Sequence, residues 1–275
     1  MTAPADSAIR PLFERLVRDG RIYELAHVMV PGMPIFPAHA PYTLTLNRRH
    51  GDPHARPRPG KSSFANEVIV MPGHTATHID ALGHFSRAGK VYGGCPAGDI
   101  ETHQGLSRLD ISAIAPIWRR AVMLDVAAYR KVDVLAAGAA VRAEELQAIA
   151  AAQQVTVEVG DVILIRTGWA RHWTAAPAIF NGGEGGFPGP DSDGAAWLLE
   201  HRAGMAGSDT PAFEAIPYPG DSVHAMLLVD NGIHIMENLN LEELARDRVY
   251  SFLFIALPLR IFGGTGSPMR PIAVV

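Results

Sequence analysis

The sequence contains a single cysteine, Cys95, among 275 residues. One thiol cannot form an internal disulfide framework, and it cannot supply the thiolate-rich ligand set that is typical of structural zinc sites. The first residues include Asp6, Arg10 and Glu14 and do not have the apolar run of a secretory signal peptide. We therefore expect a cytoplasmic protein in a reducing compartment.

An excess of positive charge is also absent, because 24 Lys and Arg residues face 28 Asp and Glu residues, for a net charge of −4. This balance gives no electrostatic basis for binding nucleic acid. The most apolar run, Ser251 to Leu259, is far shorter than the roughly 20 residues that span a bilayer. There is no G-x-S-x-G motif, and the glycine-rich stretch 263–267 lacks the Lys of a phosphate loop. Nucleic acid, membrane and nucleotide partners are therefore not expected, and neither is a serine nucleophile.

Histidine, in contrast, is plentiful, with 12 residues in the chain. Three of them stand with a carboxylate in the pattern H-x3-H-x-D-x3-H, formed by His74, His78, Asp80 and His84. Imidazole and carboxylate groups are ligands of borderline metals such as Zn, Mn or Fe. Mixed His and carboxylate sets more often leave a position open for water or substrate than structural sites do. The alternative is that these histidines bind nothing and occur on the surface or in the core by chance.

The spacing favours a ligand set on an extended segment. In a strand, residues i, i+4 and i+6 point to one side, whereas on a helix Asp80 would lie roughly 200° around from His78. We therefore predict that His74, His78 and Asp80 bind a divalent metal. His84 follows Gly83 and lies outside this register, so we predict that it is a catalytic general acid and base. The alternatives for His84 are packing beneath the site or binding the metal.

A second strand, predicted over residues 233–239 after a short capped helix at 221–232, carries another carboxylate. Strand alternation places Glu237 on the same face as Ile233 and Ile235, and His234 on the opposite face. A buried, unpaired carboxylate is costly, and a metal would remove that cost. We predict that Glu237 completes the metal site and that His234 is a surface residue.

The histidine-rich stretch resembles the H-x-G-T-H-x-D-x3-H motif of the cyclase-like metal-dependent hydrolases. That family includes bacterial kynurenine formamidase, isatin hydrolase and trans-dienelactone hydrolase. The chain departs from the motif at Ala76, where the family usually has Gly. The resemblance implies that a late His and a late Glu or Gln also bind the metals, and these map onto His224 and Glu237.

Other stretches extend the resemblance over nearly the whole chain. They place a substrate-binding aromatic on Phe36, in the segment P-G-M-P-I-F-P, and a second candidate for the wall of the substrate pocket on Trp169, at the end of another shared motif. Phe36 could instead plug a loop that prolines hold, and Trp169 could instead belong to the core. Asp209 could orient a ligand His or form a turn, and the role of His27 stays open.

Strand and helix patterns are mixed without a regular βαβ rhythm. We predict one domain over residues 1–275, of the α/β or α+β class, with a mixed and partly closed sheet. Residues 50–62 are rich in Pro, Gly and basic residues and predict an exposed loop or flap. The resemblance implies a swivelling β/β/α cyclase-like fold in a homo-oligomer, a dimer or tetramer.

The function implied is metal-dependent hydrolysis of an amide, lactam or lactone, such as a formamide, an isatin-like lactam or a dienelactone. One or two Zn or Mn ions per chain would polarise the carbonyl and lower the pKa of a bound water. Two other classes stay open. One is a metal-dependent lyase or isomerase that stabilises an enolate, and the other is a non-catalytic metal-binding or small-ligand-binding protein.

Overall fold

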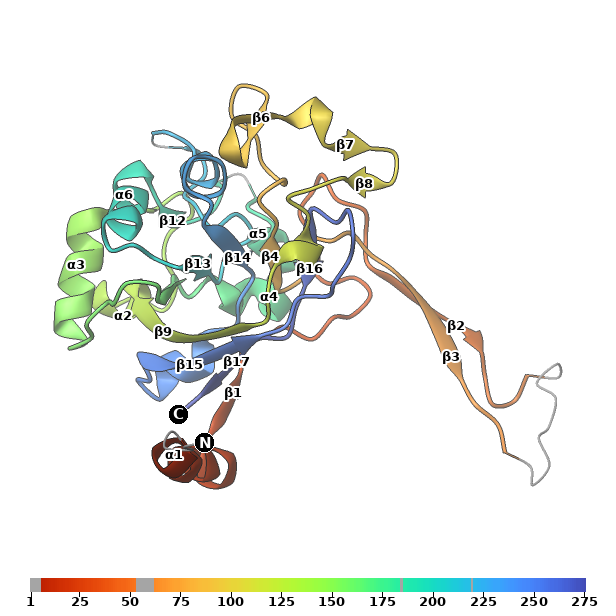
Figure 1. Ribbon diagram of the computed structural model, residues 1–275, viewed down its shortest axis with the longest axis horizontal. Coiled ribbons are helices and arrows are strands. Elements are labelled where there is room, and N and C mark those ends of the chain that lie inside the picture. Colours follow the sequence, from red (N-terminus) through yellow and green to blue (C-terminus); the bar gives the residue numbers. More distant parts are fainter. Residues whose placement is uncertain (1–5, 53–61, 184, 219) are drawn as a thin grey trace, which may run out of the picture.

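A nine-stranded mixed sheet forms the centre of the protein in the computed structural model, which describes residues 6–52, 62–183, 185–218 and 220–275 (Figure 1). In sheet order the strands are β1 (Ile22–Glu24), β17 (Ile272–Val274), β15 (Ser251–Ala256), β9 (Ile117–Asp125), β11 (Val162–Arg166), β13 (Met205–Ser208), β14 (His234–Glu237), β4 (His78–Asp80) and β16 (Gly266–Pro268). The middle strands β9, β11, β13 and β14 are parallel, and the outer pairs are antiparallel. The sheet is therefore mixed, as predicted.

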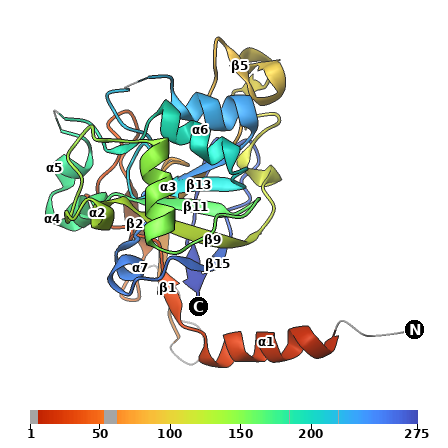
Figure 2. The same ribbon diagram turned by 90° about the vertical axis from the view of Figure 1, so that its left-hand side faces the viewer.

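Helices lie around this sheet and in its connections. They are α1 (Asp6–Asp19), α2 (Val126–Tyr129), α3 (Ala143–Ala152), α4 (His172–Ala175), α5 (Pro177–Phe180), α6 (Ser192–Glu200) and α7 (Glu242–Arg246). Figure 2 shows α3 and α6 side by side in front of β9, β11 and β13. Four strand pairs lie outside the main sheet: β2 (Thr43–Arg48) with β3 (Asn66–Val70), β5 (Lys90–Val91) with β6 (Cys95–Pro96), β7 (Glu101–Thr102) with β8 (Gly105–Leu106), and β10 (Ala140–Val141) with β12 (Gly189–Pro190).

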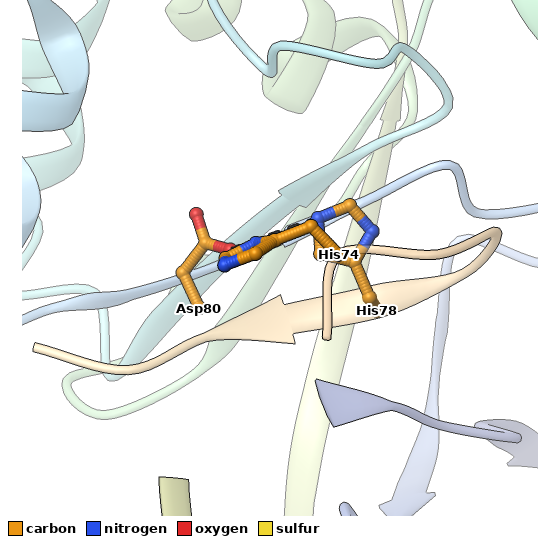
Figure 3. Close-up of side chains that lie close together, drawn as sticks. All are labelled: His74, His78 and Asp80. Atoms are coloured by element: carbon orange, nitrogen blue, oxygen red, sulfur yellow. Dashed lines mark ion pairs between the residues drawn. The ribbon is translucent and has the colours of Figure 1, made fainter. Parts of the chain in front are cut away.

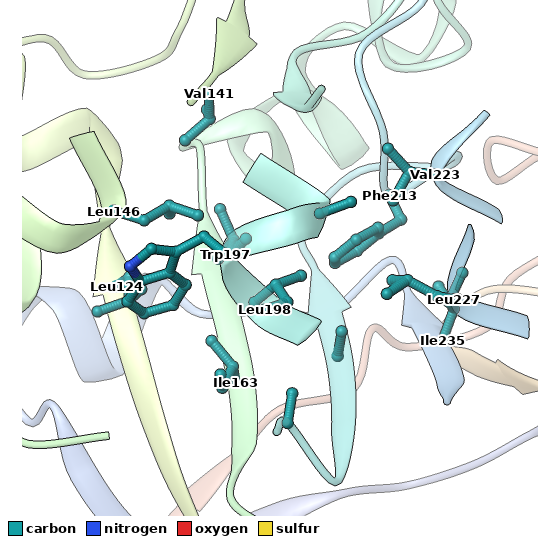
Figure 4. Close-up of a cluster of buried hydrophobic side chains, with 14 of the residues drawn as sticks. Leu124, Val141, Leu146, Ile163, Trp197, Leu198, Phe213, Val223, Leu227 and Ile235 are labelled. Atoms are coloured by element: carbon teal, nitrogen blue, oxygen red, sulfur yellow. The ribbon is translucent and has the colours of Figure 1, made fainter. Parts of the chain in front are cut away.

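The parallel strands are buried on both faces. In β11, Ile163 and Ile165 pack into the cluster beneath α3 and α6, which Figure 4 shows, whereas Val162 and Leu164 pack into a second cluster on the opposite face. Successive side chains of a strand point to opposite faces, so an uninterrupted apolar run fills two cores at once.

The strand predicted over residues 233–239 occurs as β14, His234–Glu237. The predicted helix at 221–232 is mainly a π-helix, Ala225–Asp230, which begins just after His224. Most of the predicted loop 50–62 lies outside the described residues. Among those that the structure describes, no helix is long and apolar enough to cross a membrane.

Strand β4 is the element that positions the site. It has only three residues, and it lies between β14 and β16 with antiparallel pairing on both sides. The register places His78 directly opposite Glu237 on β14 and opposite Pro268 on β16. Pairing therefore brings together segments that are more than 150 residues apart in the sequence.

Candidate metal centre

Two candidate ligands come from β4 and one from its neighbour, β14. His78 and Asp80 are alternate residues of the strand and therefore share one face. Side chains that lie directly opposite in an antiparallel pair also share a face, so Glu237 joins them from β14. His78, Asp80 and Glu237 are all at least nine-tenths buried. Strand parity, which predicted this grouping, is what produces it.

His74 reaches the site by a different route from the one predicted. Only residues 78–80 form a strand, and residues 73–77 form a series of bends in which Ala76 has a left-handed φ of 51°. The expectation of one extended segment from His74 to Asp80 is therefore wrong. A left-handed conformation favours Gly, which accounts for the Gly that the motif usually has at this position; Ala76 adopts the same conformation with backbone strain.

A glycine run later in the chain makes room for the His74 ring. A Cβ on Gly266 would lie 2.6 Å from His74 Cε1, a distance that no side chain could occupy. The adjacent hydroxyl, Thr265 Oγ1, is hydrogen-bonded to His74 Nε2 at 3.0 Å. The stretch 263–267 thus holds a metal-ligand candidate, a role that the sequence did not reveal.

The candidate ligands form two clusters that share Asp80. One consists of His74, His78 and Asp80, shown in Figure 3, and the other consists of Asp80, His224 and Glu237. Within each cluster, the ligand atoms lie within 4.8 Å of one another. A carboxylate shared by two ligand sets fits two-metal hydrolytic sites, in which the ions lie roughly 3.5–4 Å apart.

Asp80 provides the clearest sign that a cation belongs here. Its side chain is 1% exposed, and neither Oδ1 nor Oδ2 has a hydrogen-bond partner within the described chain. His74 Nδ1 lies 2.8 Å from Oδ1, but this short contact does not have hydrogen-bond geometry. Leaving a buried carboxylate unpaired is expensive, so the donor set fits a divalent cation.

The charges around Asp80 are strongly coupled. Burial alone would raise the pKa of Asp80, but His84 and His74 outweigh it and hold that pKa well below its usual range. Burial would likewise lower the pKa of His224, yet bonds to Glu214 and Glu237 raise it well above the usual value. Without a cation the site therefore attracts protons onto imidazole, so metal and protons compete for it.

Each ligand imidazole uses one nitrogen to bond the protein and directs the other toward the carboxylates. His78 Nδ1 donates to the carbonyl oxygen of Ala76 at 2.8 Å, and His78 Nε2 lies 3.4 Å from Glu237 Oε2. His224 Nδ1 donates to Glu214 Oε1 at 2.7 Å, and His224 Nε2 lies 3.1 Å from Glu237 Oε1. This arrangement is typical of metal-binding histidines.

Glu214 is a further candidate residue of the site, one that the sequence pattern does not single out. Its carboxylate accepts hydrogen bonds from the main-chain nitrogens of Val223 and His224, as well as from His224 Nδ1. It therefore holds both the start of the π-helix and the ring of His224. The available signal was a lone carboxylate within the apolar stretch 211–217, which is the same signal that identified Glu237.

A cavity of about 200 Å³ opens above the two clusters. His84 lines it, and its ring centroid lies 4.0 Å from that of His74. His84 belongs to neither ligand cluster, and no hydrogen bond holds its ring nitrogens in the part of the chain that the structure describes. Burial lowers the pKa of His84 to about 4, although Asp80 opposes the shift. The ring is thus neutral at pH 7 and faces the cavity.

Several aromatic side chains line the cavity. Phe36 lines it as expected, together with Phe85 and Phe180. His39, which the sequence analysis did not select, lies between Phe36 and His74, with ring centroids 5.5 and 5.6 Å away. Such a wall suits a small, flat, partly apolar ligand.

Trp169 does not line this cavity, so its candidate role in contacting substrate requires correction. Its side chain is 2% exposed and packs in a buried cluster with Phe180 and Phe187. Trp169 Nε1 donates to the carbonyl oxygen of Phe180 at 3.1 Å. Trp169 therefore fills the core behind Phe180, and Phe180 is the residue that lines the cavity.

Three further polar residues lie near the site without entering it. Asp209 accepts bonds from Thr167 and Gly168 and ties β13 to the end of β11, so it orients no histidine. His234 is partly buried and its Nδ1 donates to the carbonyl oxygen of Asp80 at 2.7 Å, which corrects the expectation of a surface residue. His27 stacks on Trp173, with ring centroids 4.3 Å apart.

Comparison with known sequences agrees with the family resemblance of the histidine-rich motif. The Cyclase family model matches residues 23–215. Isatin hydrolase from Roseibium aggregatum is 29% identical over 227 residues, which cover 77% of this chain and 75% of that protein. Kynurenine formamidase from Bacillus thuringiensis is 25% identical over 229 residues, which cover 78% of this chain and 88% of that protein.

Solved structures are similar over most of the chain. The crystal structure of a novel cyclase is 31% identical with a TM-score of 0.85, covering 95% of this chain and 89% of its own. Isatin hydrolase A from Ralstonia solanacearum is 22% identical with a TM-score of 0.77, covering 100% of both chains. At 22% identity, the similarity to isatin hydrolase A is evidence for a shared fold alone.

Proposed function

Because this chain belongs to the Cyclase family, we propose that it is a metal-dependent hydrolase that opens an amide, lactam or lactone bond in a small substrate. The observation that carries the proposal is the buried Asp80, which lies among three imidazoles and Glu237 and whose two oxygens have no hydrogen-bond partner within the described chain. The names of the relatives, isatin hydrolase and kynurenine formamidase, favour an amide within this range.

The residues divide the work between holding the metal and serving the substrate. His74, His78, Asp80, His224 and Glu237 would hold one or two ions of Zn or Mn. A metal in this place supplies Lewis-acid polarisation of the carbonyl and an acidified water. Glu214 fixes His224 so that its Nε2 is the nitrogen available to the metal.

The cavity residues act on the substrate. Phe36, Phe85 and Phe180 would pack against its apolar part, fix its orientation and exclude bulk water. His84 would take a proton from the attacking water at a ring nitrogen and return it to the leaving nitrogen or oxygen. The neutral state of His84 near pH 7, which burial favours, is the state that this first transfer requires.

The test is hydrolysis by purified protein after reconstitution with Zn or Mn. An aryl formamide, isatin and a dienelactone form the substrate panel, and each is measured with and without chelator. We expect turnover of at least one substrate, loss of turnover on chelation and incorporation of one oxygen from labelled water. A product without labelled oxygen would indicate a lyase or isomerase, and metal binding without turnover on any substrate would indicate a binding protein.

A further inference from the structure

Asn238 is a polar residue of the cavity to which the proposed function gives no role. It follows Glu237 directly, is 7% exposed and lines the cavity above the two ligand clusters. Its Oδ1 is buried and has no hydrogen-bond partner within the described chain. Leaving a buried amide oxygen unpaired is costly, so this atom points to a ligand that donates a hydrogen bond to it.

The main chain of Asn238 is held by hydrogen bonds on both sides. Its nitrogen donates to the carbonyl oxygen of Thr210 at 3.1 Å, and its carbonyl oxygen accepts from Thr77 Oγ1 at 2.6 Å. Asn238 has a left-handed φ of 56°, a conformation that Asn tolerates better than most residues do. The side chain therefore projects from a backbone whose position is fixed.

The orientation of the amide group follows from its contact with Ala76. Asn238 Nδ2 donates to the carbonyl oxygen of Ala76 at 3.0 Å. A carbonyl oxygen can only accept, so the nitrogen must face Ala76, and Oδ1 is the atom left for the cavity. The same carbonyl oxygen accepts from His78 Nδ1 at 2.8 Å. Asn238 therefore adjoins two candidate metal ligands, Glu237 in the sequence and His78 through Ala76.

The cavity offers acceptors rather than positive charge to a ligand. No Lys or Arg lines it among the residues that the structure describes. Asn181 also lines it, and its Oδ1 is likewise buried without a partner in the described chain. Burial, Glu214 and Glu237 raise the pKa of Tyr218, another residue of the cavity wall, so this phenol is neutral at pH 7. These features fit a neutral substrate that carries N–H donors.

We propose that Asn238 Oδ1 accepts a hydrogen bond from the N–H next to the scissile carbonyl, and that the protein therefore selects lactams over lactones. The inference rests on the proposed hydrolase function and narrows its substrate class. In a lactam ring, N–H and C=O point to the same side, so a carbonyl oxygen turned toward the metal centre turns the N–H toward the same wall. A lactone of the same shape places a second acceptor against Oδ1, which leaves both oxygens unpaired.

The first test is binding of two probes of the same shape, the lactam oxindole and its lactone counterpart 2-coumaranone. Zn-loaded protein in a His84→Ala background, in which hydrolysis should be slow, is titrated with each probe by isothermal titration calorimetry. We expect oxindole to bind at least about tenfold more tightly, because its N–H pairs with Oδ1. Adding Asn238→Ala should bring the two Kd values close together. The matched control is Asn231→Ala, which removes an exposed Asn whose Nδ2 also donates to a main-chain carbonyl oxygen, and it should preserve the preference.

The second test separates recognition of N–H from a structural role of Asn238. Asn238→Asp keeps an acceptor oxygen but loses the N–H that bonds Ala76, so it should retain the preference for oxindole that Asn238→Ala loses. Four results would overturn the proposal: no measurable binding of oxindole, equal Kd values for the two probes before Asn238 is changed, a preference that survives Asn238→Ala, or an equal loss of both probes in both Asn238 variants. A preference for oxindole without turnover of any panel substrate by the unaltered chain would support recognition of N–H and refute the hydrolase function.

Discussion

Asp80 is the residue on which both ligand clusters depend. It is the last residue of β4, the next-to-last strand of the main sheet, and its side chain is almost fully buried. Its oxygens have no hydrogen-bond partner within the described residues. Most carboxylates near a core are held by arginine or by main-chain nitrogens, as Asp209 is by Thr167 and Gly168. Asp209 is therefore a structural carboxylate, whereas Asp80, which lacks such hydrogen bonds, is a candidate metal ligand.

At the residue scale, His84→Ala should retain metal and lose turnover by about 10²- to 10⁴-fold, the usual contribution of general acid–base catalysis. The reason is that His84 lines the cavity but belongs to neither ligand cluster. Elemental analysis and kcat on the best substrate of the panel measure the two quantities. The control is His103→Ala, at an exposed position. Loss of metal from the His84 variant would make it a ligand, and normal turnover would leave it a packing role.

Glu237 and His234 provide a second comparison on one strand. Glu237→Ala should lose metal and activity, because it removes a buried ligand that faces His78 and His224. His234→Ala should keep both, because its ring bonds only the main-chain oxygen of Asp80 among the described residues. Metal content after purification checks the pair. The opposite pattern would mean that the wrong face of β14 has been assigned to the metal.

At the scale of elements, the site depends on how closely two loops approach. The bends over 73–77 pass against β16, where Gly266 leaves room for the ring of His74. The ligand segment is therefore held by a glycine from the far end of the chain. This explains a glycine-rich stretch that would otherwise resemble an ordinary turn.

Gly266→Ala should therefore displace His74 and weaken metal binding by at least about tenfold, since loss of a ligand or its orientation typically costs 10- to 100-fold. The matched control is Gly98→Ala, because a Cβ at Gly98 meets no atom within 4 Å. Titration of apoprotein with Zn, followed by competition with a chelator, measures both affinities. Equal affinities for the two variants would show that the His74 ring does not contribute to binding.

At the scale of the whole molecule, stability should depend on pH through a buried group outside the metal centre. Burial lowers the pKa of His27 to about 4 from its usual 6.5. Between these values the unfolded chain binds a proton that the folded chain does not, so stability falls as pH falls through this window. The difference amounts to roughly 3 kcal/mol for this one group.

The variant His27→Phe should show a shallower loss of stability between pH 6.5 and pH 4 than the unaltered chain. Phenylalanine keeps the stacking on Trp173, and no hydrogen bond is lost, because His27 Nε2 is buried without a partner within the described chain. Denaturant unfolding at several pH values measures the effect. His103→Phe, at an exposed site, should follow the unaltered chain, and an identical curve for His27→Phe would mean that His27 titrates normally.

The sequence alone determined the chemistry of the site and the local geometry of its strands. The types of ligand, the shared face of His78 and Asp80, and the facing of Glu237 all follow from side-chain chemistry and a period of two. These are local properties, and neighbouring residues encode them completely. The same holds for the two-sided burial of β11, which its uninterrupted apolar run indicates.

Only the tertiary structure decided the remainder. The bends that carry His74, the bond from Glu214 to His224 and the space at Gly266 each join segments whose approach depends on packing of the whole sheet. Trp169 lies in the core and Phe36 lines the cavity, although both are large aromatics, because packing of the whole chain decides which of them is covered. The pairing of β2 with β3 and the exposure of both strands likewise appear only in the folded chain. The local sequence determines which side chains of a segment share a face. Which distant segments pack against that face depends on how all segments bury their apolar side chains together.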